Sequence, residues 1–389
     1  MCEIRLVPSY RHNAQLPKIS PHSPRLDAHR GFDEQRHLIS RDRGSLAMAG
    51  LRLAAAVSMS SRRPGNDLPP GLLCSALASL VSSQQALLAG GATHCDKLLL
   101  TVNMTAANRA FVNAASGRRV IILDVADKRS GLSRIWTRIP PHLLPYSLKL
   151  AVIGLAQYDG VLVTDADAFF ISRQPWDPRV QPWLYDRTGP ANTYSPLNAG
   201  RFAVRPSPQR EATLLAALRR RFSATSGWGG NYSEGLRDIV RAYRRPVVQR
   251  CSENTSWCFI GADIDQGLLV HLLASEEHFG AGFLLNSSRF AFDRNFVHFT
   301  PMSPKPLEAI APTAYARAAV QCKQDSTFAS KFDRFWRLWK MRLGPLLAQS
   351  SPACPNEARW ALERWERRTA VPPPRDGNLT QPIALVVSG

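Results

Sequence analysis

The stretch KLAVIGLAQYDGVLVTDADAFF, residues Lys149–Phe170, decides the fold of this chain. Apolar residues at helical spacing end at a Gln-Tyr-Asp-Gly turn, and the apolar run Val161–Val163 then leads into Asp165-Ala-Asp167. This order predicts a helix, a turn, a buried strand and two carboxylates. Because alternate residues of an extended chain point to the same side, Asp165 and Asp167 are expected to face one hard cation together. The alternative is a solvated acidic turn.

The preceding segments predict an α/β fold. Strands are expected at Leu51–Met59, 97–102 and 119–125, and helices between them at about 68–88 and 106–115. This order is typical of a mostly parallel sheet with helices on both faces. The segment that Met48 opens superficially resembles a short signal sequence, but we favour the first strand of the sheet for it.

Length and charge narrow the classes of function. At 389 residues the chain can hold one large or two ordinary domains. Its formal net charge of +19 would suit a nucleic-acid-binding protein, yet the basic residues are scattered and most are arginines in an Ala-rich and Pro-rich chain. We therefore expect no nucleic-acid partner, and basic nucleic-acid binding is the less favoured alternative. No run of about 18 uninterrupted apolar residues occurs, so no transmembrane segment is expected.

The cysteines and sequons leave the compartment open. The seven cysteines lack Cys-x-x-Cys spacing, so a structural zinc site is not expected. Cys251 and Cys258 could close a small disulfide loop, and the odd total leaves at least one thiol free. Five Asn-x-Ser/Thr sequons matter only if the chain enters the secretory pathway. Both the cytoplasm and the Golgi lumen remain possible locations.

The stretch around the two carboxylates resembles the signature of the glycogenin-like glycosyltransferases, glycosyltransferase family eight. In that family a Lys stands one helix ahead of an Asp-x-Asp pair that follows an apolar strand. Lys149 stands in this way ahead of Val161-Leu-Val-Thr-Asp-Ala-Asp167. The resemblance implies a GT-A fold, in which a Rossmann-like, mostly parallel sheet with helices on both faces binds a nucleotide sugar through a divalent metal.

Two further blocks resemble the family in the same order along the chain. Asn198, Ala199 and Gly200 come directly before an apolar strand that is expected to begin at Gly200. The family's Asn contacts the sugar there, and small residues let backbone amides approach a ligand. Asp265 and Gln266 open a Leu-rich helix and resemble the pair that binds the transferred sugar near the reacting carbon.

The last block, Phe296–Pro306, resembles the family's closing His-Phe and Lys-Pro signature. It implies that His298 joins the two carboxylates as a metal ligand. An imidazole beside two carboxylates favours Mn2+, with Mg2+ possible. Lys305 would contact the diphosphate, and Lys149 would offset the charge that builds up on the departing phosphate.

Each assignment has a structural alternative. Asp263 or Asp265 could cap the helix, Lys149 could be a solvated residue at a helix start, and His298 could be a core histidine. The family usually has Asn four residues after its Asp-Gln pair, whereas this chain has Val270. The sugar contacts on that side are therefore expected to differ.

The domain organisation follows from these blocks and from composition. We expect a disordered tail over 1–49, a GT-A domain over 50–310, a C-terminal helical extension over 311–370 and a disordered tail over 371–389. Residues 223–257 resemble an insertion. The extension carries an aromatic stripe at helical spacing that is expected to pack on the catalytic domain rather than on a membrane surface: Phe328, Phe332, Phe335, Trp336 and Trp339.

The sequence thus predicts a metal-dependent glycosyltransferase that moves a hexose from a UDP-sugar donor to a hydroxyl acceptor with retention of the anomeric configuration. The acceptor is an unidentified carbohydrate, protein or small molecule. Self-glucosylation is not expected, because no Tyr occurs between Asp265 and His298, where the glycogenin acceptor would lie. The alternative is a UDP-sugar-binding protein without catalytic activity.

Overall fold

The computed structural model describes the central part of the chain. The described residues are 50–60, 67–116, 118–125, 144–170, 173–187, 195–230, 232, 236–237, 240, 257–259, 261–276, 296–298, 326–345, 348, 354 and 363. The tails expected to be disordered, 1–49 and 371–389, lie outside these residues, as do Lys305 and the expected domain boundary near residue 310.

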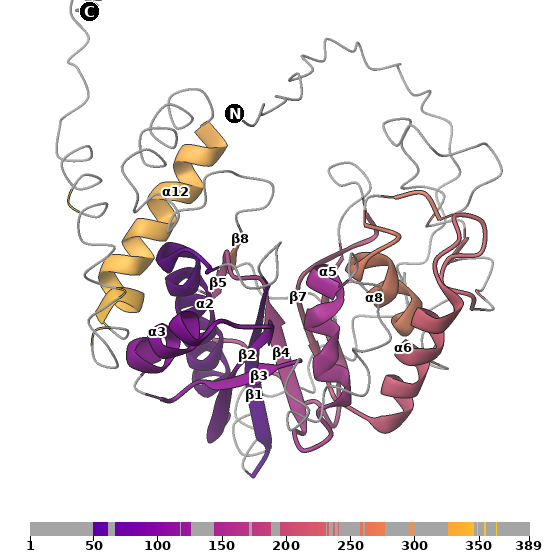
Figure 1. Cartoon of the computed structure of the whole chain (residues 1–389), viewed down its shortest axis with the longest axis horizontal. Coiled ribbons are helices and arrows are strands. Elements are labelled where there is room, and N and C mark those ends of the chain that lie inside the picture. The colour runs from indigo at the N-terminus through magenta and orange to yellow at the C-terminus, as the bar shows by residue number, and fades with distance from the viewer. Residues whose placement is uncertain are drawn as a thin grey trace, which may run out of the picture. The chain divides into compact units, whose positions relative to one another are not determined.

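A six-stranded sheet lies at the centre of the described structure (Figure 1). Its strands are β1 (Arg52–Ser60), β2 (His94–Val102), β3 (Ile121–Asp124), β4 (Gly160–Thr164), β6 (Trp183–Arg187) and β7 (Leu197–Val204), in the order β3-β2-β1-β4-β7-β6. The first four strands of this order pair in parallel, and the pairs β4–β7 and β7–β6 are antiparallel. The predicted α/β class with a Rossmann-like, mostly parallel sheet is confirmed.

A two-stranded sheet accompanies the main one. It pairs β5 (Ala168–Phe170) with β8 (Phe296–His298) in antiparallel register. The strand expected to begin at Gly200 starts earlier, at Leu197, because Leu197 and Asn198 already pair with β6.

Helices cover both faces of the main sheet. They are α2 (Pro70–Ala89), α3 (Ala106–Ser116), α5 (Leu144–Ser147), the 3-10 helix η3 (Leu148–Gly154), α6 (Pro208–Arg220), α8 (Asp265–Ala274), α12 (Ser326–Leu338) and the π-helical turn η6 (Trp339–Leu343). The predicted positions of the first three strands and of α2, α3 and α8 agree with these bounds to within a few residues.

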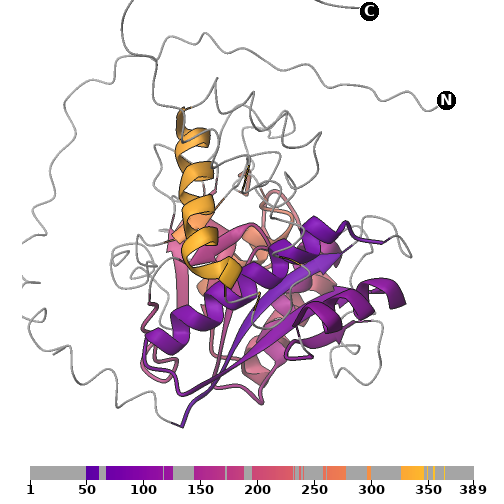
Figure 2. The same ribbon diagram turned by 90° about the vertical axis from the view of Figure 1, so that its left-hand side faces the viewer.

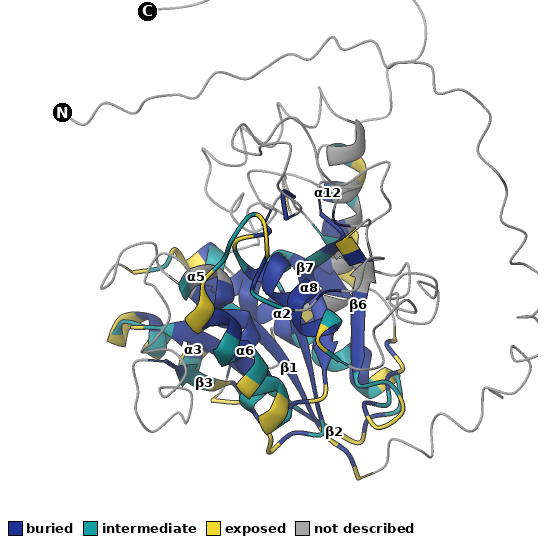
Figure 3. Cartoon of the chain, turned by 90° about the vertical axis from the view of Figure 1, so that its right-hand side faces the viewer, coloured by how far each residue is buried: buried dark blue, intermediate teal, exposed yellow. Residues whose placement is uncertain are grey.

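Side-chain alternation along the strands divides the core between the two faces. Ala54, Val161 and Val163 pack with η3, α6 and α8 on one face. Val57 and Leu99 pack with α2 and α12 on the other. The strands are accordingly buried, while exposed residues lie on the outer sides of helices and in loops (Figure 3).

Helix α2 is long and apolar enough, by length and composition, to span a membrane. The criterion of an uninterrupted apolar run does not select this helix, because Ser and Gln interrupt it. In the structure 67% of its apolar window is buried inside the chain. This is the burial of a core helix, so α2 gives only weak support for a membrane span.

Helix α12 meets α2 (Figure 2), and four of the five aromatic side chains of the predicted stripe pack in the apolar cluster of α2, while the side chain of Phe328 lies outside the described ones. Phe332, Phe335, Trp336 and Trp339 are buried in the same apolar cluster as α2. The ring of Phe335 lies 4.9 Å from that of Phe169 in β5. The extension therefore contacts the strand that directly follows the Asp-x-Asp pair.

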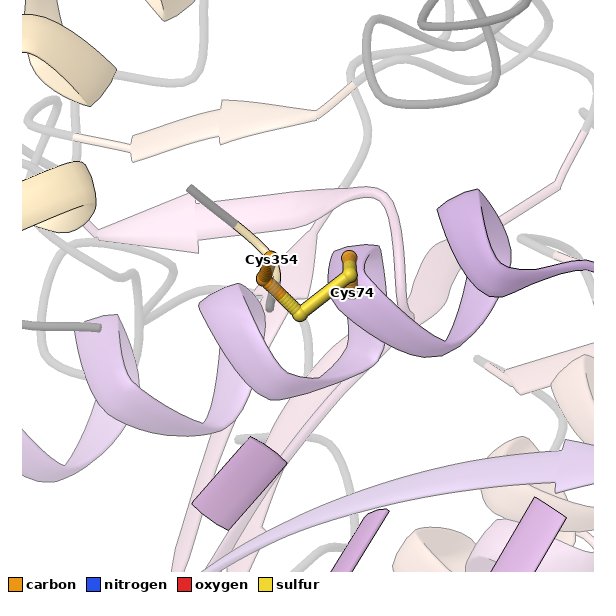
Figure 4. The surroundings of a disulfide bond; sticks show 2 residues. All are labelled: Cys74 and Cys354. Atoms are coloured by element: carbon orange, nitrogen blue, oxygen red, sulfur yellow. A yellow bond between two sulfur atoms is a disulfide. The ribbon is translucent and has the colours of Figure 1, made fainter. Parts of the chain in front are cut away.

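A disulfide bond joins Cys74 of α2 to Cys354 (Figure 4). The two cysteines are 280 residues apart in the sequence, and pairing over such a distance cannot be deduced from spacing. Cys258 is also disulfide-bonded, and Cys251, its predicted partner, lies outside the described residues. Cys95 is a buried free thiol, which confirms that at least one cysteine is unpaired.

Candidate active site

The two carboxylates lie in the turn between β4 and β5. Asp165 follows the last residue of β4, and its backbone N–H donates to the Gly200 carbonyl of β7 at 2.7 Å. The Ala168 N–H donates to the Asp165 carbonyl at 3.1 Å. These bonds hold the turn at the carboxyl end of the parallel strands, where open α/β sheets bind ligands.

Strand β8 brings His298 to this turn. Its pairing with β5 sets His298 opposite Ala168, next to the carboxylates. The His298 Nε2 atom lies 3.5 Å from Asp167 Oδ1 and 3.7 Å from Asp165 Oδ2. One ligand atom from each of the three residues can be chosen so that all lie within 4.8 Å of one another. The structure thus brings together the three residues that the sequence marked as metal ligands.

The spacing of these atoms suits a shared cation. The gaps from imidazole to carboxylate exceed ordinary hydrogen-bond lengths. Ligand atoms at about 2.1 to 2.4 Å from one ion lie roughly 3 to 4 Å apart when they occupy neighbouring positions. One imidazole nitrogen and two carboxylate oxygens fit a divalent transition metal, and three protein ligands leave positions for water or for oxygens of a ligand.

Gly200 makes room for the imidazole. A Cβ at this position would overlap His298 Cε1 and would lie 2.9 Å from Nε2. Asn198 contacts the same ring: its Nδ2 lies 3.2 Å from His298 Nδ1, and its Oδ1 accepts from the Gly200 N–H at 2.8 Å. The Asn198 side chain, which the family resemblance assigns to the sugar, is therefore engaged with the histidine and with its own strand.

Lys149 lies buried between two carboxylates from different elements. Its Nζ is 2.7 Å from Asp165 Oδ1, 2.8 Å from Asp265 Oδ2 and 3.1 Å from the Ala199 carbonyl oxygen. Burial by itself lowers the pKa of Lys149, but the attraction of the two carboxylates outweighs it and the net pKa is raised. The alternative of a solvated lysine is therefore wrong, and all three ammonium donors are used inside the protein.

Helix α8 begins with the Asp-Gln pair. The Asp265 Oδ1 atom accepts from the Gln266 N–H at 2.9 Å, while Oδ2 holds Lys149. The positive end of the helix dipole further stabilises this carboxylate. The Gln266 side chain packs over Gly261, where a Cβ would approach its Nε2 to 2.5 Å. Both residues are therefore held in place by short-range contacts.

Asp263 does not cap this helix, contrary to one sequence-based alternative. The N-cap residue is Ile264, and it has no side-chain cap bond. The backbone carbonyl of Gly261 accepts from Ile264 N–H at 3.2 Å and from Gly267 N–H at 2.8 Å. The turn before α8 thus satisfies part of the helix start without a carboxylate.

All the predicted site residues that the structure describes lie in one connected network. They are Lys149, Asp165, Asp167, Asn198, Ala199, Gly200, Asp265, Gln266 and His298. Two hydroxyl groups of α2 that were not expected at the site, those of Ser75 and Ser79, bond to the Asp-x-Asp turn. Their spacing of four in a largely apolar helix is the signal that could have found them.

No protein-family model matches this chain, and no curated protein matches it. Parts of the chain are similar to solved structures of glycosyltransferases. The galactosyltransferase LgtC in complex with donor and acceptor sugar analogues is 17% identical over 39% of this chain and 57% of its own, with a TM-score of 0.23. Mouse xyloside xylosyltransferase 1 is 15% identical over 42% of this chain and 72% of its own, with a TM-score of 0.29.

A third similar structure is the bifunctional glycosyltransferase WbbM, 11% identical over 66% of this chain and 47% of its own, with a TM-score of 0.30. The chain spans little more than half the length of the LgtC structure. Because these TM-scores are low, the likeness does not identify a reaction for this protein. Its function has to follow from the residues of its own site.

Proposed function

We propose that this chain is a metal-dependent glycosyltransferase with a GT-A fold. The observation that carries the proposal is the meeting of Asp165, Asp167 and His298 at the carboxyl edge of the sheet. His298 comes from a part of the chain distant from the two carboxylates, and the ligand atoms of the three residues are spaced as ligands of one ion. A solvated acidic turn without a function would not explain the histidine beside it, which lies in the space that Gly200 leaves and next to the Asn198 amide.

Asp165, Asp167 and His298 would hold a divalent cation, Mn2+ with Mg2+ as the alternative, against the diphosphate of a nucleotide sugar. Such a cation neutralises the charge that develops on a departing diphosphate. Lys149 holds Oδ1 of Asp165, so that Oδ2 is directed toward His298. Asn198 lies beside the imidazole, with its Nδ2 3.2 Å from Nδ1; when Nε2 holds the cation, Nδ1 carries the ring proton, and the amide would then have to turn its oxygen toward this nitrogen.

Asp265 and Gln266 would orient the transferred sugar. The Asp265 carboxylate is held by Lys149 and by its own helix, and each oxygen keeps a further lone pair for a sugar hydroxyl. A fixed negative charge there would stabilise an oxocarbenium-like centre. Since its three donors are already used, Lys149 would act on the phosphate only through the carboxylates that it holds. One ammonium group would thereby set the spacing between the metal side and the sugar side of the site.

The remaining details of the proposal rest on the family resemblance. They are a UDP-hexose donor, with glucose or galactose as the hexose, retention of configuration, and diphosphate contact by Lys305. The acceptor would be a hydroxyl of a carbohydrate, a protein or a small molecule.

Disulfides such as Cys74–Cys354 persist mainly in oxidising compartments, which favours the Golgi lumen over the cytoplasm.

Thermal-shift titration tests this function. The chain is melted with UDP-glucose, UDP-galactose, UDP-xylose or UDP-N-acetylglucosamine, each with and without Mn2+. We expect one sugar to raise Tm only when the metal is present, because a ligand that binds the native state stabilises it. Asp167→Asn should abolish this shift. Asp96→Asn, a matched change at the opposite end of the sheet in β2, should leave it intact.

Four other outcomes would change the conclusion. Stabilisation by a UDP-sugar that ignores the metal, or a normal shift in Asp167→Asn, would contradict the metal assignment. Metal-dependent binding without hydrolysis or transfer on a broad acceptor panel would favour a nucleotide-sugar-binding protein without catalytic activity. Strongly salt-dependent RNA or DNA binding without any response to UDP-sugars would favour nucleic-acid binding.

A further inference from the structure

Helix α2 presents a row of buried serines to the Asp-x-Asp turn. Ser75, Ser79, Ser82 and Ser83 recur at helical spacing, and none is more than 3% exposed. A buried hydroxyl in a helix commonly donates to a carbonyl of its own helix, as Ser82 does with the Ser79 carbonyl at 2.9 Å, while its oxygen accepts from the Phe170 N–H at 3.2 Å. Ser75 and Ser79 instead donate to carbonyls of a different element.

These two hydroxyls contact the backbone that carries the metal-binding carboxylates. Ser75 Oγ donates to the Ala166 carbonyl at 2.6 Å. Ser79 Oγ lies 2.7 Å from the Ala168 carbonyl and 3.0 Å from the Asp165 carbonyl. Three of the four carbonyls between Asp165 and Ala168 thus face hydroxyl donors of one helix.

The number of hydroxyl protons in this cluster determines the direction of its hydrogen bonds. Ser79 has a single hydroxyl proton, which the two carbonyls share. Thr164 Oγ1, 2.9 Å from Ser79 Oγ, must then be the donor of the bond between them. Ser83 Oγ lies 3.2 Å from Thr164 Oγ1 and donates to it. The chain of hydroxyls therefore ends on the carbonyls of the turn, and each bond polarises the next.

Helix α2 is itself well anchored. Cys74, directly before Ser75, is joined to Cys354. On the far side of the turn, Phe169 packs against Phe335 of the C-terminal extension. The serines therefore project from an element that packs on the sheet and is joined to the C-terminal extension by the disulfide and the aromatic cluster. Sites built on such supported elements keep their geometry better than sites on free loops.

We propose that Ser75 and Ser79 are positioning residues of the metal centre. They do not touch the cation. They fix the backbone from Asp165 to Ala168 and thereby the directions in which the two carboxylates leave it. This inference rests on the proposed function for the cation, whereas the hold on the turn does not depend on any ligand.

The test compares Ser79→Ala with Ser83→Ala, the same change in the same helix at an equally buried position. Alanine favours the helix, so α2 keeps its conformation in both variants. Only Ser79→Ala removes bonds to the turn, since Ser83 bonds to the Thr164 side chain. Two quantities are measured: amide hydrogen exchange of residues 164–170 without metal, and Mn2+ affinity in the presence of UDP by titration calorimetry.

We expect Ser79→Ala to speed exchange in the turn and to weaken Mn2+ binding about 10-fold to 100-fold, the usual effect of losing a group that orients metal ligands. Ser83→Ala should stay within about twofold of the wild type, since it removes no bond to the turn. Ser75→Ala should act in the same direction as Ser79→Ala, and it decides the question should Ser79→Ala not fold.

Wild-type exchange and affinity in Ser75→Ala and Ser79→Ala would overturn the proposal. Equal losses in Ser83→Ala would also overturn it, because they would point to general packing of α2. If the wild type itself binds no Mn2+, the proposed function fails. Faster exchange in Ser79→Ala alone would then still support the hold of the serines on the turn, and unchanged exchange would refute it.

Discussion

Replacing Gly200 by alanine would test the metal site with a single methyl group. The new Cβ would overlap His298 Cε1 and stand 2.9 Å from Nε2, whereas ordinary van der Waals contact begins at 3.4 Å. The ligand nitrogen would have to retreat by at least 0.5 Å, the difference between these two distances. Because metal–ligand distances tolerate only about 0.2 Å, His298 could not keep its place on the cation.

The expected loss is large for so small a change. Displacing one of three protein ligands should weaken Mn2+ binding at least tenfold, by comparison with the 10-fold to 100-fold effects of disturbing groups that merely orient ligands. The extra methyl should lower the free energy of unfolding by only about 1 to 3 kcal/mol, the usual cost of overpacking. Titration calorimetry with Mn2+ in the presence of UDP measures the first effect, and urea unfolding without metal measures the second.

A double-mutant cycle isolates the cause. In a His298→Ala background the ring is absent, so Gly200→Ala should change Mn2+ affinity no further. Additive effects of the two substitutions would show that the methyl acts elsewhere. Mn2+ binding by Gly200→Ala within twofold of the wild type would refute the geometry of the site outright.

Three other perturbations probe the surroundings of the site. Lys149→Met should lower the free energy of unfolding by about 3 to 5 kcal/mol in urea titrations at pH 7, because it leaves two buried carboxylates without the ammonium group that they share. Since the pKa of Lys149 is raised in the folded state, the wild-type contribution should persist at every pH below the ordinary pKa of lysine. It should be lost only as the pH rises above that value. Cys354→Ser should cost about 2 to 5 kcal/mol in non-reducing unfolding experiments, and an unchanged midpoint would show that the bond to α2 adds nothing. Burial, followed by the charge of Arg220, lowers the pKa of His271 from 6.5 to about 4; stability should therefore fall by about 2 kcal/mol between pH 7 and pH 5 as the unfolded state takes up a proton, and melts of His271→Gln should lack this part of the slope.

Much of the architecture was predictable because it follows from local patterns. The apolar runs of β1, β2 and β4 and the helical spacing of α2 and α8 are properties of short segments. The helical spacing of the aromatic residues in α12 likewise predicts that this face of the helix is buried. Missed features, such as the early start of β7 at Leu197, depend on a partner strand that local patterns do not contain.

The residue types of the site were readable in the same way, because Asp165 and Asp167 close an apolar strand and Asp265 opens a helix. Spacing along the chain could not reveal that one ammonium group, Lys149, joins Asp165 to Asp265. Spacing does place Ser75 and Ser79 on one face of α2, but it could not reveal that this face meets the Asp-x-Asp turn.

Local spacing tells which side of a strand or helix a residue occupies, and this information was enough to predict the α/β class and the candidate ligands from the sequence. Contacts between distant segments depend on strand register and on the packing of helices against the sheet. The pairing of Ala168 with His298, the room for the imidazole above Gly200 and the bond from Cys74 to Cys354 all belong to this second kind. They arise only once the core has formed, because burial of the two faces of the sheet sets which remote segments meet.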